Sequence, residues 1–151
     1  MKQIQNSFYF KNDSKLSNYY ICPVKIDGLL FQSSEAAYHA QKFKDPVIQQ
    51  LMTRFTPDES KHVSRELTRF IRSDWHEVKY KLMKKVVLAK FAQNANCANE
   101  LLNTKNKTLI EDTTGWHDNI WGECACVNCQ NKEHQNLLGR ILVEVRSELQ
   151  N

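Results

Sequence analysis

Residues 16–42 read LSNYYICPVKIDGLLFQSSEAAYHAQK, a sequence that joins a hairpin turn to the start of a helix. Asp27-Gly28 lies between apolar residues, and this dipeptide is the strongest short-range signal for a β-hairpin. We therefore predict a hairpin over Pro23–Phe31. A serine ahead of an alanine-rich segment is a good helix N-cap, because its hydroxyl accepts a hydrogen bond from a free backbone N–H. The helix is predicted to begin near Ser33 or Ser34.

This predicted helix carries an acid and an amine on one face. Glu35 and Lys42 are seven residues apart, which on a helix is about two turns and roughly 10 Å along the axis. The Tyr38 ring lies between them. The layout suits acid–base chemistry at an amine, and it equally suits a solvated ion pair worth a few tenths of a kcal/mol.

The rest of the chain predicts a helical protein with a few short strands. Between Ser34 and Thr104 the pattern is almost wholly helical, with Pro46 and Pro57 suited to first turns of helices. A buried stripe at three-four spacing runs along Asp74–Phe91. We predict an α+β fold, dominated by helices and containing a small antiparallel sheet or hairpin, as a single domain over residues 1–151. The further predicted segments are strands at Ser7–Phe10 and Thr108–Glu111, an aperiodic functional loop at Thr113–Gln135 and a last helix at Asn136–Gln150.

Composition is that of an ordinary globular protein, with 41% hydrophobic and 25% charged residues. No apolar run reaches the roughly 18 residues of a membrane span, and Met1–Asn6 lacks the apolar core of a signal peptide. Five cysteines, an odd number, favour reduced thiols and a cytoplasmic location. The net charge of +4 suits a phosphate-bearing ligand and is too weak to indicate nucleic-acid binding by itself.

A series of short motifs gives the chain a family resemblance. In order and spacing it resembles the NADAR family, whose YbiA-like members are N-glycosidases. Two segments depart from the family pattern: Thr68-Arg69 stands where many relatives have a Gly-Arg pair, and Glu123–Cys129 replaces a glycine-rich stretch that is known in some relatives. The matching motifs are Leu16–Tyr20, Ile26–Gly28, Ser34-Glu35 with Tyr38, Gln41–Phe43, Asp74-Trp75, Lys79, Met83, Ala89–Phe91, Leu101–Thr104, Leu109–Glu111, Asp118–Gly122, Asn136–Gly139 and Glu144–Arg146.

What the resemblance implies is hydrolysis of the bond between a ribose and an exocyclic amine or base, without a cofactor. The implied substrates are ribosylamino-pyrimidine phosphates of the riboflavin pathway and guanine carrying ADP-ribose in DNA. A neutral Lys42 would attack the imine of the opened sugar to give a Schiff base. Glu35 would move protons, and Asp118 would orient or activate water. Trp121 offers a face for base stacking, worth roughly 1–3 kcal/mol.

Several of the implied substrate contacts also have plain structural interpretations. Trp75 heads an apolar stripe and suits the core, Asn18 suits a local cap in a turn, and Asn136 suits the N-cap of the last helix. Lys79 and Lys90 suit exposed positions at the edge of the stripe. Arg65, Arg69 and Arg72 have helical spacing and suit either a phosphate clamp or solvated surface. The substrate-binding residues predicted from the resemblance are Asn18, Tyr38, Trp75, Arg69, Arg72, Trp121, Gly122 and Asn136.

The segment after Trp121 is rich in cysteine. Cys124, Cys126 and Cys129, with His134 or His117 as a fourth ligand, have the residue types of a zinc site. Free thiols in a mobile loop are the simpler interpretation, and the implied chemistry requires no metal. The competing functions are a non-catalytic module that binds ADP-ribose or a nucleotide, and a nucleic-acid binder organised by zinc.

Overall fold

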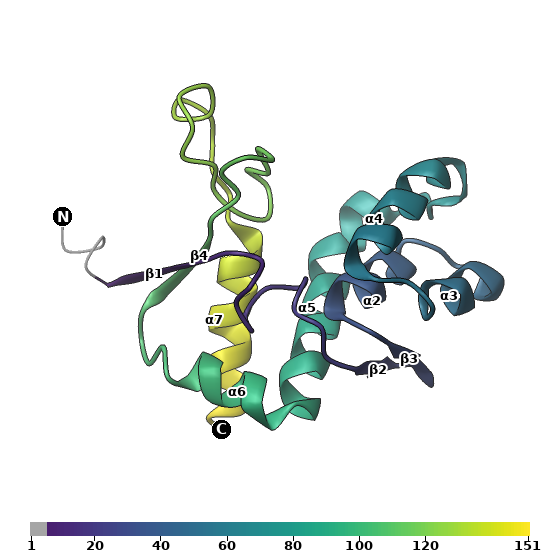
Figure 1. The fold of residues 1–151 in the computed structure, drawn as a ribbon, viewed down its shortest axis with the longest axis horizontal. Coiled ribbons are helices and arrows are strands. Elements are labelled where there is room, and N and C mark those ends of the chain that lie inside the picture. The colour runs from purple at the N-terminus through teal and green to yellow at the C-terminus, as the bar shows by residue number, and fades with distance from the viewer. Residues whose placement is uncertain (1–5) are drawn as a thin grey trace. The chain divides into compact units, whose positions relative to one another are not determined.

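A computed structural model describes residues 6–151, which divide into two compact units. The central unit is continuous in sequence and covers residues 18–95. The terminal unit combines residues 6–17 with residues 96–151, so it draws on both ends of the described chain. Both helices and strands are present, which confirms the α+β class (Figure 1).

The central unit begins with the predicted hairpin. Its strands pair antiparallel from Val24↔Phe31 to Ile26↔Leu29. Asp27 and Gly28 form the turn, with φ angles of 50° and 85°. Positive φ at both central residues is characteristic of the type I′ turn, which suits a two-residue hairpin. The elements of this unit are β2 (Val24–Ile26), β3 (Leu29–Phe31), α2 (Ser34–Gln41), α3 (Pro46–Met52), α4 (Pro57–Glu66), the 3₁₀ helix η1 (Thr68–Phe70) and α5 (Trp75–Gln93).

Helix α2 is the centre of this unit and contacts α3, α4, α5 and both strands of the hairpin. It begins where the sequence predicts, since the Ser33 hydroxyl accepts a hydrogen bond from Ala36 N–H at 3.1 Å. The side chains of Ala36, Ala37 and Ala40 are fully buried. Their small size lets neighbouring helices approach α2 on several sides, so the ends of α2 are held rigidly.

Two further helix starts match the predicted proline positions. Pro46 begins α3 after the N-cap Asp45, and Pro57 begins α4 after the N-cap Thr56, which forms a capping box with Glu59. One expectation for α5 is wrong: Lys90 is not exposed at the edge of the stripe but has no exposed surface. Its ammonium lies 5.0 Å from the Phe91 ring centroid. Lys79 is half-buried.

The terminal unit is built on a parallel strand pair. Strand β1 (Ser7–Phe10) pairs with β4 (Thr108–Glu111), in register from Ser7↔Thr108 to Phe10↔Glu111. Both strands were predicted, whereas their parallel pairing is additional to the predicted antiparallel sheet. Helix α6 (Ala95–Leu102) begins at the boundary of the two units, and α7 (Leu137–Leu149) packs against β4 (Figure 1).

Close packing of α7 on β4 requires a glycine. A Cβ on Gly139 would lie 1.9 Å from the carbonyl oxygen of Leu109. Asn136, just before the helix, donates from Nδ2 to that oxygen at 2.8 Å and accepts from Glu111 N–H at 3.3 Å. Asn136 therefore occupies the predicted N-cap position, but its side chain bonds to the strand and not to the first turn of α7.

The predicted loop at residues 113–135 contains neither helix nor strand among its described residues. One isolated parallel bridge, Asp112↔Glu123, ties it to the end of β4. Within residues 6–151, no helix has the length and apolar character needed to cross a membrane.

Candidate active site

Lys42 lies at the end of α2, where its amine is partly shielded from water. The Nζ atom lies 5.4 Å from the Tyr38 ring centroid and 5.9 Å from that of Trp75. The two rings are themselves 5.4 Å apart. Nζ also donates to the Ser64 hydroxyl on α4 at 3.3 Å. The amine is therefore bounded by two aromatic rings and one hydroxyl, all from the central unit.

This environment lowers the pKa of Lys42 from its usual 10.5 to about 8. Burial is the largest cause, because it penalises the charged form; Arg65 and Lys61 lower the pKa further, and Glu35 opposes them. At pH 7 about a tenth of the amines are then neutral, against roughly three in ten thousand for an ordinary lysine. Lys42 can act as a nucleophile near neutral pH.

Glu35 pairs with a histidine that the sequence analysis missed. Its Oε2 lies 2.7 Å from Nε2 of His39, one turn further along α2. Burial lowers the pKa of His39, whose side chain is only 7% exposed, so the ring is neutral at pH 7. We place its proton on Nε2, where the carboxylate accepts it. Among the described residues, Nδ1 then has no hydrogen-bond partner.

Helix α4 contributes charged side chains near Lys42, and of these the sequence analysis considered Arg65 alone. Asp58, Lys61 and Arg65 recur at helical spacing, and Asp58 accepts a hydrogen bond from the Tyr19 hydroxyl. Burial, together with the charges of Glu35 and Asp58, raises the pKa of Tyr19 and keeps it protonated. A helix start was readable from Thr56 and Pro57, but a charged helix face in a sequence normally indicates solvent.

The predicted row of arginines is not a helical row. Helix α4 ends at Glu66, and Arg69 falls in η1. The Arg69 guanidinium lies 5.1 Å from the Phe70 ring centroid, and Arg72 forms two hydrogen bonds to Asp74, at 2.6 and 3.0 Å. The shared helical spacing is therefore wrong, and phosphate binding by Arg69 and Arg72 stays a prediction.

Asn18 and Trp75 have structural contacts. The Asn18 side chain accepts from the Ser34 hydroxyl at 2.8 Å and donates to the Met83 sulfur at 3.4 Å. The backbone carbonyl oxygen of Asn18 accepts a hydrogen bond from Glu35 N–H at 3.0 Å, so Asn18 holds the first turn of α2. Trp75 is buried, as its place in the apolar stripe predicts, and it also forms part of the wall around Lys42.

The remaining predicted residues lie together in the terminal unit. Asp118 organises its loop, because Oδ1 accepts from Ile120 N–H at 3.0 Å and from Trp121 N–H at 2.9 Å. Gly122 is buried, and a Cβ there would lie 2.5 Å from the carbonyl oxygen of Glu111. These contacts explain why an aspartate and a glycine stand at these positions. Substrate contacts from Asp118, Trp121, Gly122 and Asn136 stay predictions.

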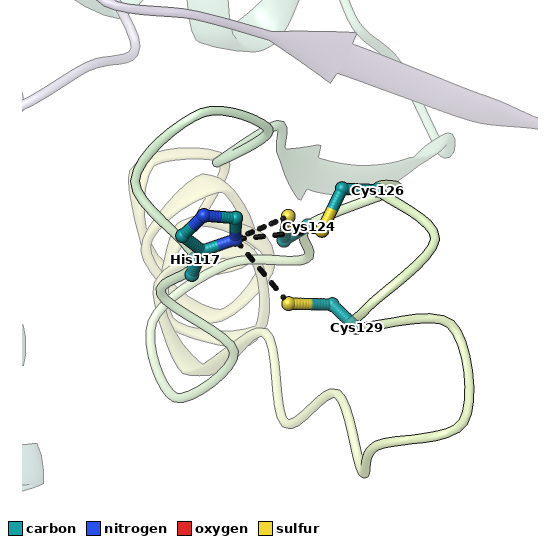
Figure 2. Close-up of side chains that lie close together, drawn as sticks. All are labelled: His117, Cys124, Cys126 and Cys129. Carbon is teal, nitrogen blue, oxygen red and sulfur yellow. Dashed lines mark hydrogen bonds between the residues drawn. The ribbon is translucent and has the colours of Figure 1, made fainter.

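The loop also brings a histidine and three cysteines together, as Figure 2 shows. Nδ1 of His117 lies 3.4 Å from the sulfur atoms of Cys124 and Cys126 and 3.5 Å from that of Cys129. His134, the other histidine proposed as a ligand, is not part of this group: its Nε2 is hydrogen-bonded to the Cys129 carbonyl oxygen at 2.9 Å.

Comparison with known families places the chain in one of them. The sequence profile of the NADAR domain matches residues 7–150, nearly the whole chain. The chain belongs to the NADAR family. This assignment confirms the resemblance that the sequence motifs indicated.

Related proteins match this NADAR chain over most of its length. It is 32% identical to the N-glycosidase YbiA of Escherichia coli over 146 residues, covering 95% of this chain and 87% of that protein. It is 35% identical to a riboflavin biosynthesis protein of Vibrio vulnificus over 141 residues, covering 93% of this chain and 36% of that larger protein. The chain therefore spans about a third of the length of the Vibrio protein.

The solved structure of E. coli YbiA, determined by NMR, has the same fold as this NADAR chain. The two superpose with a TM-score of 0.82 at 29% sequence identity, over 96% of this chain and 85% of YbiA.

Proposed function

We propose that this NADAR protein is an N-glycosidase that hydrolyses the bond between ribose C1′ and an exocyclic amine, through a Schiff base on Lys42. The observation that carries the proposal is the shielded amine of Lys42, with its pKa near 8 beside Glu35. Two relatives, YbiA and a protein of Nostoc punctiforme, bear the name N-glycosidase. A protein that only bound nucleotides would gain nothing from a partly neutral amine.

The proposed reaction begins when the sugar ring opens. The exocyclic nitrogen becomes an imine at C1′; the Glu35 carboxylate takes the proton that this nitrogen loses and passes it to the ring oxygen. The Nε2–H of His39 holds the Glu35 carboxylate through the 2.7 Å contact. The neutral amine of Lys42 then adds to C1′, and the two protons of Nζ pass to the original nitrogen. The bond between C1′ and that nitrogen breaks, the nitrogen leaves as a free amine, and Nζ remains as the Schiff base.

Hydrolysis completes the cycle. Water adds to the lysine Schiff base at C1′, and the bond from C1′ to Nζ breaks, which releases the free sugar and restores the Lys42 amine. We propose that Asp118 orients this water and that Trp121 stacks on the base. Overall one water is consumed and one sugar and one free amine are released, so the reaction needs neither oxidant nor reductant.

The proposed substrates carry a phosphate. Lys61 and Arg65 place positive charge close enough to Lys42 to lower its pKa, and the same charge would attract a phosphorylated sugar. Arg69 and Arg72 are further candidates for phosphate contacts. Since one relative is named a riboflavin biosynthesis protein, we place ribosylamino-pyrimidine phosphates first and ADP-ribosylated guanine second. We also propose a reducing, cytoplasmic location, which the odd number of five cysteines supports.

Reductive trapping tests the covalent step. Each candidate substrate is incubated with protein and sodium borohydride, and the protein is then analysed by intact-mass and peptide mass spectrometry. We expect an adduct of the sugar on the peptide that contains Lys42, and none in Lys42→Ala. Turnover without an adduct in the wild-type protein would overturn the Schiff-base route. Binding of substrate with neither turnover nor adduct would favour the nucleotide-binding module.

A substrate panel tests the choice of substrate. Release of free base and of sugar phosphate is measured with a ribosylamino-pyrimidine phosphate and with guanine-linked ADP-ribose, alone and in single-stranded DNA. We expect kcat/KM to be highest for the pyrimidine phosphate. A higher kcat/KM for the guanine substrates would reverse our order of preference.

A further inference from the structure

The cysteine cluster of the terminal unit, formed by His117, Cys124, Cys126 and Cys129, lies outside the proposed chemistry. No two of its four potential ligand atoms are more than 4.8 Å apart. Three sulfur atoms converge on one ring nitrogen, Nδ1 of His117 (Figure 2).

Hydrogen bonding does not explain this convergence. An imidazole nitrogen carries either one proton or one lone pair, so Nδ1 can make one good hydrogen bond and not three. Packing three thiols this close together also places side by side groups that repel one another once they are ionised to thiolates. A cation at the centre of the cluster would satisfy all four atoms at once.

The distances fit a tetrahedral metal. With bonds of about 2.3 Å from zinc to sulfur and about 2.0–2.1 Å from zinc to nitrogen, tetrahedral angles separate nitrogen from sulfur by roughly 3.5–3.6 Å. The three distances from Nδ1 of His117 are 3.4, 3.4 and 3.5 Å. Three thiolates and one imidazole form a common ligand set for zinc. Mg²⁺ and Ca²⁺, by contrast, prefer oxygen ligands.

The loop backbone holds these ligands in place. His117 has a left-handed backbone with φ of 60°, a conformation that a non-glycine residue keeps only where its surroundings require it. Cys124 N–H donates to the Asn119 side chain at 2.8 Å. Cys129 N–H donates to the Cys126 carbonyl oxygen at 3.1 Å, which closes the tight turn between these two cysteines.

We propose that the cysteine cluster binds one Zn²⁺ ion in a closed, structural site with three cysteines and one histidine as ligands. Protein atoms fill all four positions, so no position remains for a water or a substrate. The ion would cross-link a loop that lacks helix and strand and would fix the segment between His117 and Cys124. That segment carries Asp118 and Trp121, but the proposal stands on the ligand geometry and not on the reaction.

Metal analysis of the full chain tests the proposal. The protein is purified under reducing conditions, loaded with zinc, passed through a desalting column and analysed for metal by mass spectrometry. We expect about one zinc per chain. Replacement by Co²⁺ is expected to give the visible absorption of tetrahedral cobalt bound to thiolates, which reports the ligand type directly.

A matched pair of histidine variants identifies the ligands. His117→Ala and Cys126→Ser are expected to lower zinc affinity at least tenfold, measured by competition with a coloured chelator. His134→Ala, in the same loop but outside the cluster, is expected to bind zinc as the wild type does. Equal affinity in His117→Ala, Cys126→Ser and His134→Ala would show adventitious binding and overturn the proposal.

Thiol protection gives a readout that needs no variant. With zinc bound, Cys124, Cys126 and Cys129 are expected to react slowly with a thiol reagent, and a chelator is expected to restore fast reaction at these three residues. Substoichiometric zinc after loading, reactivity unchanged by chelator, or a native Cys126–Cys129 disulfide in protein purified without oxygen would each overturn the proposal.

Discussion

The two units of this NADAR protein position their functional candidates by different physical means. In the central unit, Glu35 and Lys42 stand at the two ends of α2, a helix packed on several sides through alanines. In the terminal unit, Asp118 and Trp121 lie in a loop shaped by hydrogen bonds that backbone N–H groups donate to side chains. Apolar packing thus holds the acid and amine, while polar contacts hold the loop candidates.

This difference teaches where change is tolerated. A packed helix keeps its geometry as long as its buried face is kept, so the chemistry placed on it is inherited with the fold. A loop held by individual polar contacts can be rebuilt by a few substitutions. The cysteine-rich segment lies in the loop and not in α2.

The most severe test of the comparison is Lys42→Ala. We expect kcat/KM to fall about 10³-fold or more, because the nucleophile is lost while the packing of α2 is not. Lys42→Arg is expected to be equally inactive, since a guanidinium stays protonated. Lys79, a half-buried lysine on α5, provides the matched control: Lys79→Ala should keep kcat/KM within about threefold of the wild type. A folded Lys42→Ala protein within tenfold of the wild type would contradict the role of the amine.

Glu35→Gln sharpens the comparison within α2. Positioned acid–base groups contribute about 10²–10⁴-fold in rate, and we expect a loss of about 10²-fold in kcat with little change in the unfolding transition. The exposed acid Glu77→Gln on α5 provides the control. If both variants lost activity equally, general charge and not a positioned acid would be responsible.

Gly139→Ala tests the packing of the terminal unit. The added methyl group would meet the Leu109 carbonyl oxygen, and overpacking of this kind typically costs about 1–3 kcal/mol. We expect urea denaturation to show a loss of that size in the free energy of unfolding. Ser147→Ala, on the exposed side of the same helix, should change it by less than about 0.5 kcal/mol. Equal stability of Gly139→Ala and wild type would show that α7 moves away from β4 without cost.

The smallest expected effect is on pH dependence. Activity that needs a neutral Lys42 should rise with pH through about 8, because protonation below that value removes the nucleophile.

Two variants should shift this pH profile in opposite directions. Arg65→Gln removes a positive charge that lowers the pKa of Lys42, so the midpoint of the plot of kcat/KM against pH should move to higher pH. Glu35→Gln removes the negative charge that raises this pKa, so its residual activity should have a lower midpoint. Both shifts should shrink at high salt, where exposed charges are screened. Shifts in the same direction would contradict the electrostatic account.

Local signals in the sequence predicted much of the fold. The Asp27-Gly28 turn, the Ser33 cap and the prolines at 46 and 57 are all confirmed, because a turn, cap or first helical turn depends on only a few neighbouring residues. The parallel pairing of β1 with β4 was not predictable in this way, since nothing in either strand's own sequence specifies a partner about 100 residues away.

The candidate site shows the same contrast between local signals and contacts made by tertiary packing. Glu35, Tyr38 and Lys42 could be predicted as neighbours because they belong to one helix with a fixed period. His39 sits on that helix four residues after Glu35 and could have been found by the same spacing. Asp58, Lys61 and Ser64 were not predictable as site residues, because only tertiary packing brings this face of α4 to α2. The burial of Lys90 was missed for a similar reason: long charged side chains are almost always placed at the surface in a sequence-based prediction.

The pairing of β1 with β4 also bears on how the chain folds during synthesis. Residues 18–95 can complete their contacts as soon as they leave the ribosome, whereas β1 must wait for a partner that follows it by about 100 residues. Closing so long a loop is entropically costly unless the intervening chain is already compact. We expect pulse-labelled hydrogen exchange during refolding to show protection of α2 amides before those of β1 and β4. The segment that carries the Lys42 amine would then be folded before these two strands pair.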